Sequence, residues 1–225
     1  MNSMLVELNS FLKKNNIHSV SIKQSPDCFN EHNTLLHEAM RKLHITIAKE
    51  INHHVELSKK ADLFSEMQKR RINKCLKSGF KFLNGNSFSD ALLYQFLVKC
   101  RAQQKLKVNI TEQHFSKLIR ELDSNFDVHV VTDSFNNLTA CLVIIKVTES
   151  ITYSFLPAFD RNYSQFSPLA FLFHNYFNRA KNSSIEMIDL GISSINGKPQ
   201  EGLINFKEGI GGIRTDRFSY HWDLQ

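Results

Sequence analysis

One helical pattern between two strand patterns constrains the fold most strongly. Residues 167–182 place apolar side chains at helical spacing, with Ser167 suited to the N-cap and Pro168 to the first turn. Strand patterns precede this helix at 151–159 and follow it at 184–190. Two neighbouring strands that are joined through a helix run parallel. The sheet that contains them must therefore include a parallel pair.

Elsewhere the apolar periodicity alternates between strand and helix spacing. The expected strands are residues 18–24, 45–57, 80–84, 127–133, 138–147 and 213–224, and the expected helices are residues 1–16, 31–43, 62–79, 87–105, 111–122 and 199–209. Short turns separate the strands from 127 to 159, which indicates an antiparallel meander. We therefore predict an α/β fold of the α+β type with a mixed sheet, divided into residues 1–105 and 106–225.

The net charge and the cysteine spacing indicate which ligands to expect. The net charge of +6 favours a phosphate-bearing partner such as a nucleotide, CoA, tRNA or an anionic lipid surface. Cys28, Cys75, Cys100 and Cys141 form no CxxC pair, so we expect buried thiols in a reducing compartment and no metal site.

The chain shows no pattern typical of membrane insertion or secretion. Its longest apolar run, residues 138–147, is too short to cross a bilayer and contains Lys146. No charged and apolar signal-peptide pattern begins the chain. We therefore expect a cytoplasmic protein without a membrane span.

Residues 163–212 carry a motif that resembles the C-terminal domain of FemAB-like acyltransferases, which have the GNAT fold. The motif runs from Tyr163 and the Pro168 helix to a strand that ends in Asp189-Leu190-Gly191. Gly202-Leu203, Phe206-Lys207 and a glycine-rich turn at Gly209, Gly211 and Gly212 close it. The resemblance implies an acyl-CoA N-acyltransferase fold, similar to bacterial GNAT N-acetyltransferases of polysaccharide loci. Residues 1–105 then correspond to a partial GNAT-like lobe with a basic helix.

The resemblance also implies where the acyl donor binds. In a GNAT fold two central parallel strands separate, and the donor enters between them; here these are strands 151–159 and 184–190. Pro157 and Ala158 would lie at the separation, because proline offers no N–H to a neighbouring strand. Ser167 begins the helix whose N-terminus would hold the donor pyrophosphate. The usual glycine-rich phosphate loop is absent, so Arg161 would compensate. Lys207 would bind a donor or acceptor phosphate, with a surface lysine that lies along Phe206 as the alternative.

Proton transfer and acceptor binding need further side chains. Asp189 is predicted as the base or amine-binding carboxylate, with a carboxylate that caps the next turn as the alternative. Tyr163 and Tyr220 are candidate acids, and His129 and Ser193 are candidate substrate-binding residues; packing is the alternative for the tyrosines and a structural role for His129.

The glycines are expected to shape the cleft: Gly191 leaves space beside Asp189, Gly202 allows its helix to pack closely, and Gly209, Gly211 and Gly212 end that helix.

The function that follows is acyl transfer from acetyl-CoA or another acyl-CoA to an amino group. The acceptor is predicted to be a nucleotide-linked amino sugar for cell-surface polysaccharide, with acyl-CoA as a co-substrate and no tightly bound cofactor. An aminoacyl-tRNA-dependent Fem-type transferase and a non-catalytic GNAT-like binding module are the alternatives. The predicted helix 62–79 has a basic face formed by Lys69, Arg70, Lys74 and Lys77. This face is a candidate for tRNA contact, and the alternative is a solvated helix face, which is the more common case.

Overall fold

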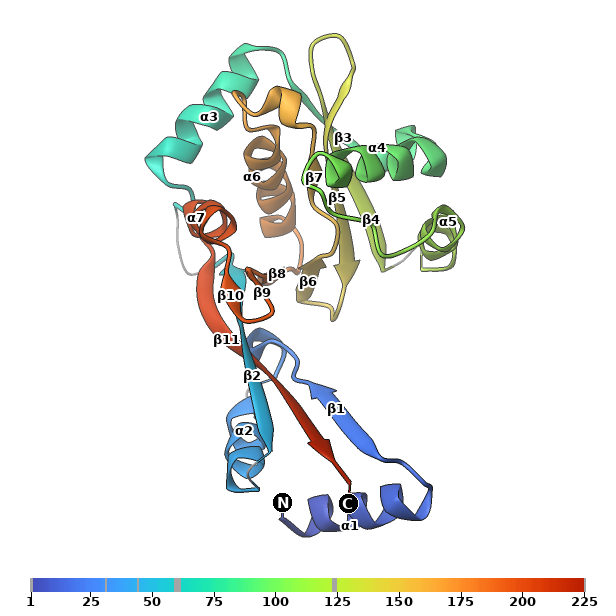
Figure 1. Cartoon of the computed structure of the whole chain (residues 1–225). Coiled ribbons are helices and arrows are strands. Elements are labelled where there is room, and N and C mark those ends of the chain that lie inside the picture. Colours follow the sequence, from blue (N-terminus) through green and yellow to red (C-terminus); the bar gives the residue numbers. More distant parts are fainter. Residues whose placement is uncertain (1, 31, 44, 59–61, 123–124, 225) are drawn as a thin grey trace. The chain divides into compact units, whose positions relative to one another are not determined.

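The computed structural model describes residues 2–30, 32–43, 45–58, 62–122 and 125–224, and it divides into two compact units (Figure 1). The first unit comprises residues 1–53, 192–204 and 214–225, and the second comprises residues 54–191 and 205–213. The predicted boundary between residues 105 and 106 follows a helix of the second unit, and as a division into two lobes it stays a prediction.

The first unit is built on three neighbouring strands, and the first two in the sheet order are antiparallel. Its strands are ordered β1 (Ser19–Lys23), β11 (Ile213–Asp223) and β2 (Thr46–Glu56), and Ile22 of β1 lies opposite Tyr220 of β11. Helices α1 (Asn2–Lys14) and α2 (Asn33–Lys42) accompany these strands. A small core around Met40, Ala39 and Tyr220 joins α2 to β11. The short strands β9 (Ser194–Ile195) and β10 (Lys198–Pro199) form a separate hairpin.

The second unit contains the mixed sheet. The end of β2 is followed across this sheet by β8 (Met187–Ile192), β6 (Ile151–Ser154), β5 (Leu138–Lys146), β4 (Phe126–Thr132) and β3 (Lys81–Asn84). β6 and β8 are parallel, whereas the β3–β4, β4–β5 and β5–β6 pairs are antiparallel. This arrangement confirms the predicted meander and the parallel pair that the connecting helix requires.

Helices cover both faces of this sheet (Figure 1). Helices α3 (Glu66–Lys77) and α6 (Pro168–Lys181) pack on the face that presents Leu142 and Ile188. Helices α4 (Asp90–Ala102) and α5 (Glu112–Glu121) pack on the face that presents Cys141 and Val143. Successive residues of β5 thus enter different cores, because side chains alternate across a strand. Helix α7 (Glu201–Gly209) follows β10 along the chain.

Side-chain caps begin three of the described α-helices. The side chains of Ser65 and Thr111 accept hydrogen bonds from the first turns of α3 and α5, as N-cap residues do. The helix predicted from residue 87 begins later, because Ser89 caps α4 and Ser87 lies in a short 3₁₀ helix. Ser167 occupies the N-cap position of α6, but its φ of 57° is left-handed and its side chain makes no capping hydrogen bond.

Two further sequence expectations change in the structure. The predicted strand 151–159 is two strands, β6 and β7 (Ala158–Phe159), because the chain leaves regular pairing between them. A Cβ added at Gly202 would meet no atom within 4 Å, so the prediction that Gly202 permits close helix packing is wrong. The predicted start of the second helix at residue 31 lies outside the described residues.

Three of the four cysteines are buried apolar side chains, whereas Cys28 is only partly buried, so the prediction of a buried thiol is wrong there. Cys75, Cys100 and Cys141 are buried thiols, and burial raises the pKa of Cys75 and of Cys100 to about 12. Among the described residues, no group of three potential metal ligands comes together. None of the helices described here has the length and apolar character needed to cross a membrane.

Candidate active site

The parallel pair β6–β8 ends inside the sheet. Its register runs Ile151 with Met187, Thr152 with Ile188 and Tyr153 with Asp189, and β6 then ends at Ser154 while β8 continues to Ile192. Beyond Ser154 the chain stays on β5, because the N–H groups of Phe155 and Leu156 both donate to the carbonyl of Val143. Two N–H groups on one carbonyl form a bulge, which diverts the strand. The register therefore agrees with the expected separation of the two strands after Tyr153.

A buried carboxylate and a buried lysine lie at this point. Asp189 of β8 is 2% exposed and Lys207 of α7 is 5% exposed. The Lys207 ammonium donates to the carbonyl of Gly191 at 2.8 Å, and the N–H of Gly191 donates to Asp189 Oδ1 at 2.8 Å. These contacts join the end of β8 to the last turn of α7. The N–H of Gly212 also donates to the carbonyl of Lys207 at 2.8 Å, which holds the helix end in place.

Burial changes the pKa of Lys207. Burial lowers its pKa from 10.5 to about 7, and the negative charge of Asp189 opposes this shift only partly. A lysine of this kind exchanges its proton in the physiological range, which an exposed lysine does not do. The sequence motif identifies Lys207, but nothing in the local sequence distinguishes a buried amine from an exposed one.

The titration of Lys207 predicts how stability depends on pH. Below about pH 7 the lysine is protonated in both states, and the folded state carries the full cost of the buried charge. Between about pH 7 and 10.5 the unfolded chain keeps a proton that the folded chain has lost, so stability rises with pH. Lys207 should add at most about 1.4 kcal/mol per pH unit to this rise.

Urea denaturation of the wild type and of Lys207→Met at several pH values between 7 and 10.5 measures this contribution. The rise that the two proteins share reports the other titrating groups, and the difference in slope belongs to Lys207. Equal slopes would contradict a depressed pKa for this amine.

Glycine at position 191 keeps the site open. Its φ of +74° lies in the left-handed region, and a Cβ there would lie 3.3 Å from the ring of Tyr153. The prediction that Gly191 leaves space beside Asp189 agrees with this geometry. A larger residue would both strain the backbone and press on Tyr153, the last β6 residue that pairs with β8.

Ser154 is a candidate site residue that the sequence patterns do not identify. It is 3% exposed, and among the described residues its hydroxyl has no hydrogen-bond partner. A buried hydroxyl without a partner destabilises the folded protein and marks a position where a ligand can supply the missing hydrogen bond. Only its place, one residue after the end of parallel pairing, could have drawn attention to it.

Four of the five residues predicted to hold the donor follow one another along the chain; the fifth, Lys207, is buried in α7, where its ammonium donates to the carbonyl of Gly191. Pro157 precedes β7, Ala158 is buried and pairs with Cys141, and Arg161 is exposed at the start of the 3₁₀ helix η3 (Arg161–Tyr163). The backbone N–H of Arg161 donates to Gln103, while Ser167 begins α6. Their roles in donor binding stay predictions.

The two predicted tyrosine acids have protein partners elsewhere. The Tyr163 hydroxyl donates to Asp133 Oδ2 at 2.8 Å, and this hydrogen bond, with burial, raises the pKa of Tyr163. Tyr220 belongs to the first unit, where its hydroxyl donates to Gln24 at 2.8 Å and lies 3.2 Å from His37 Nδ1. These contacts favour the alternative, in which both tyrosines are packing residues whose hydroxyls already have hydrogen-bond partners.

The two predicted substrate-binding residues are also buried in separate surroundings. His129 of β4 is fully buried between the rings of Phe82 and Tyr176, and its Nε2 lies 3.0 Å from Asp127 Oδ2. Ser193 belongs to the first unit, where its hydroxyl lies 2.9 Å from His53 Nδ1. No contact described here joins either residue to Asp189 or Lys207, so their roles in acceptor binding stay predictions.

Comparison with known families decides the class of protein. The family described as acetyltransferase (GNAT) domain matches residues 65–202, which is more than half of the chain. The chain belongs to this family. It is therefore a GNAT acyltransferase, as the motif in residues 163–212 implies.

Solved structures share this GNAT fold at low sequence identity. FemX is 11% identical with a TM-score of 0.69, over 96% of this chain and 75% of its own. The C-terminal domain of a putative lysylphosphatidylglycerol synthetase from Agrobacterium fabrum is 13% identical with a TM-score of 0.66, over 96% and 71%. A tandem GNAT protein from the clavulanic acid biosynthesis pathway is 10% identical with a TM-score of 0.57, over 100% and 70%. A search of curated proteins finds no match.

The basic helix of this GNAT protein is partly engaged with its own chain. Lys69 forms ion pairs with Asp62 and Glu66, and Lys74 donates to the carbonyl of Gln165 and lies 4.8 Å from the ring centre of Phe166. These contacts reduce the charge that α3 offers to an outside polyanion. They favour the solvated helix face over a tRNA-binding surface.

Proposed function

We propose that the protein transfers an acyl group from acyl-CoA to an amino group, with Lys207 as the proton carrier. The observation that carries this proposal is a buried lysine with a pKa of about 7 beside the end of a parallel strand pair. For a lysine with only a structural role, this burial would be unfavourable, because burying its charge destabilises the folded state. Perturbed pKa values of this kind are typical of active sites.

The surroundings of Ser154 fit an acyl donor. The separation of β6 from β8 provides a strand edge, and the partnerless hydroxyl of Ser154 lies next to it. Acyl-CoA carries amides in its pantetheine arm, which can hydrogen-bond to a strand edge and to a hydroxyl. The N-terminus of α6, with Arg161 shortly before it, would attract the donor phosphates through the positive end of the helix dipole.

The reaction needs one proton carrier and no covalent nucleophile. The acceptor nitrogen attacks the thioester carbonyl carbon and gives a proton to the neutral Lys207 amine. The carbon–sulfur bond then breaks, and the leaving thiolate takes the proton from the Lys207 ammonium. Asp189 stabilises that ammonium in between, and Lys207 ends as a neutral amine. The products are an amide and free CoA.

The acceptor class is proposed from the sequence motif. Its similarity to GNAT proteins of polysaccharide loci favours an amino sugar, carried on a nucleotide. A Fem-type transferase that uses aminoacyl-tRNA is the second candidate, and the likeness to FemX in fold supports keeping it. The non-catalytic binding module is less favoured, because burial of Lys207 and Asp189 would then lower the stability of the folded protein without serving catalysis.

Two measurements on the full chain test this function. Calorimetry with acetyl-CoA and longer acyl-CoAs should detect donor binding, and a thiol-release assay with nucleotide-linked and free amino sugars should detect transfer. Binding without transfer would favour an acceptor of another class, and aminoacyl-tRNA would be tried next. If none of these acyl-CoAs binds, the acyl-CoA proposal fails.

Ser154→Ala separates donor binding from stability. Removal of a buried hydroxyl without a partner should raise the free energy of unfolding by about 1 kcal/mol. It should also weaken acyl-CoA binding by about 3- to 10-fold, because the donor loses a hydrogen bond. Denaturation and calorimetry on the same preparations measure both effects, with Ser87→Ala, an exposed serine, as the matched control. A variant that is less stable and binds the donor normally would remove Ser154 from the site.

A further inference from the structure

A cavity in the second unit lies at an edge of the sheet that β3 leaves uncovered. The pairing of β3 with β4 ends at Asn84 with His129, so residues 126–128 of β4 extend beyond it. Gly85 then turns the chain so closely against β4 that an added Cβ would lie 2.9 Å from the carbonyl oxygen of Val128. The cavity beside this edge has a volume of about 310 Å³, at the lower end of the range for small-molecule sites.

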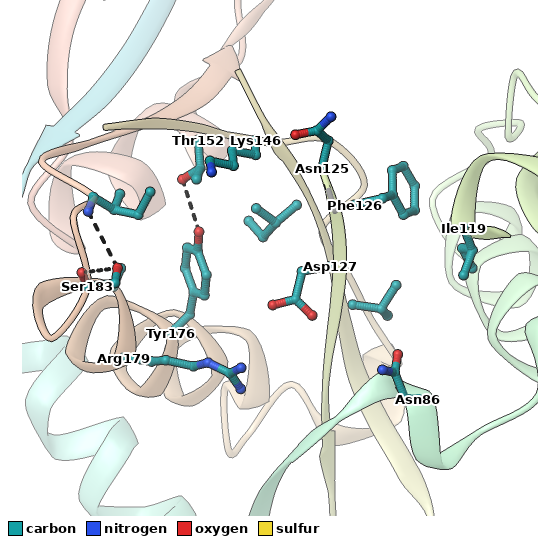
Figure 2. A pocket seen from close by; sticks show the side chains of 14 residues that line it. Asn86, Ile119, Asn125, Phe126, Asp127, Lys146, Thr152, Tyr176, Arg179 and Ser183 are labelled. Carbon is teal, nitrogen blue, oxygen red and sulfur yellow. Dashed lines mark hydrogen bonds between the residues drawn. The ribbon is translucent and has the colours of Figure 1, made fainter. Parts of the chain in front are cut away.

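Opposite charges enter the cavity from two elements. Figure 2 shows the side chains of Asp127 from β4 and Arg179 from α6 directed into the same space. Asp127 pairs with the buried His129 at 3.0 Å, and within the described ranges Arg179 forms no ion pair of its own. Burial raises the pKa of Asp127, but the hydrogen bond of His129 and the charges of His129 and Arg179 outweigh it and hold the pKa below its usual value. The cavity thus presents a carboxylate and a guanidinium that a ligand can engage separately.

The remaining walls fit an apolar group. Ile144 and Ile185 line the cavity together with a polar floor, where Tyr176 donates its hydroxyl to Thr152 at 2.9 Å (Figure 2). Lys146 also lines the cavity, but its ammonium is paired with Glu149 at 2.7 Å. The carboxylate of Asp127 and the guanidinium of Arg179 are therefore the charged groups best able to select a ligand.

We propose that this cavity binds a free α-amino acid with an aliphatic side chain. The ligand carboxylate pairs with Arg179, whose planar guanidinium suits a carboxylate. The ligand ammonium pairs with Asp127, and the ligand side chain packs against Ile144 and Ile185. A simple anion would place its negative charge beside Asp127 without engaging that carboxylate, and a simple amine would leave Arg179 without an ion-pair partner. The lining residues do not include Tyr153, Ser154, Asp189 or Lys207, so this site is distinct from the proposed transfer site.

Calorimetric titration of the full chain with L-leucine tests the proposal. Leucine should bind with a Kd below about 1 mM, and 4-methylpentanoate and isoamylamine, which each lack one charge, should bind at least about tenfold more weakly. Arg179→Gln and Asp127→Asn should each weaken leucine binding at least about tenfold. Arg70→Gln, an exposed arginine on α3, should leave it unchanged.

The two sites can be distinguished in these experiments. Arg179 is exposed at the surface of α6, so Arg179→Gln should fold normally and keep acyl-CoA binding even if Asp127→Asn disturbs His129. Leucine binding is scored whether or not acyl-CoA binds, so failure of the transfer function leaves this test intact. No leucine binding to the wild type, or equal binding to wild type and Arg179→Gln, would overturn the proposal.

Discussion

Replacement of Lys207 with glutamine is expected to lower kcat/KM for acyl transfer by about 100- to 10,000-fold. Glutamine keeps a donor for the carbonyl of Gly191 but cannot accept a proton from the acceptor amine. Acyl-CoA affinity should change little, because the proposed donor contacts come from Ser154 and the start of α6. Thiol release under saturating acyl-CoA, together with calorimetric donor binding, separates the two effects.

The pH profile and two further variants make this test specific. The wild-type kcat/KM should rise about tenfold per pH unit below about pH 7 and level off above it, as the Lys207 amine becomes neutral. Lys207→Arg keeps the positive charge but stays protonated, so it should be as inactive as Lys207→Gln. Lys181→Gln removes an exposed lysine and should behave as wild type. Wild-type activity in Lys207→Arg would show that Lys207 contributes its charge and no proton transfer.

Gly211→Ala is expected to lower the free energy of unfolding by about 2–4 kcal/mol. Gly211 has a φ of +94°, and an added Cβ would lie 2.9 Å from both the Cβ and the carbonyl oxygen of Leu63. A backbone oxygen cannot move aside as a flexible side chain can, so the strain must be taken up by the turn that follows α7. Urea denaturation with fitted midpoints measures the loss.

Gly202→Ala is the matched control for this prediction. Gly202 lies in α7, and nothing within 4 Å would contact its added Cβ. Alanine should therefore stabilise the protein by about 0.5–1 kcal/mol through its helix propensity. If Gly211→Ala is as stable as the wild type, the turn after α7 is less constrained than its φ and contacts indicate.

The sequence predicted the fold well where local patterns are strong. The apolar stripe of residues 167–182 identifies α6, because eight of its residues from Pro168 to Ala180 are buried on the side that meets the sheet and α3. The strand patterns of residues 127–159 likewise predict the meander β4–β5–β6. Together with the motif from Tyr163 to Gly212, they led to the GNAT family, which the match to residues 65–202 confirms.

The candidate site was predictable only in part. Asp189, Gly191 and Lys207 belong to the motif, and the structure brings them into one hydrogen-bonded group. Tyr163 and Tyr220 were reasonable candidates by residue type, but their hydroxyls are hydrogen-bonded to Asp133 and Gln24. A hydrogen-bond partner thirty or more positions away leaves no local trace in the sequence.

By itself, the sequence determined the order of helices and strands, the parallel pair around α6 and the family, because these depend on periodicity and on residues close together in the chain. Only the tertiary structure decided that parallel pairing ends at Tyr153 and Asp189, that Lys207 is buried there, and that Asp127 and Arg179 share a cavity. These features arise where separate elements pack together. Burial and charge at such points shift a pKa or open a pocket, and both depend on neighbours that are distant in the sequence.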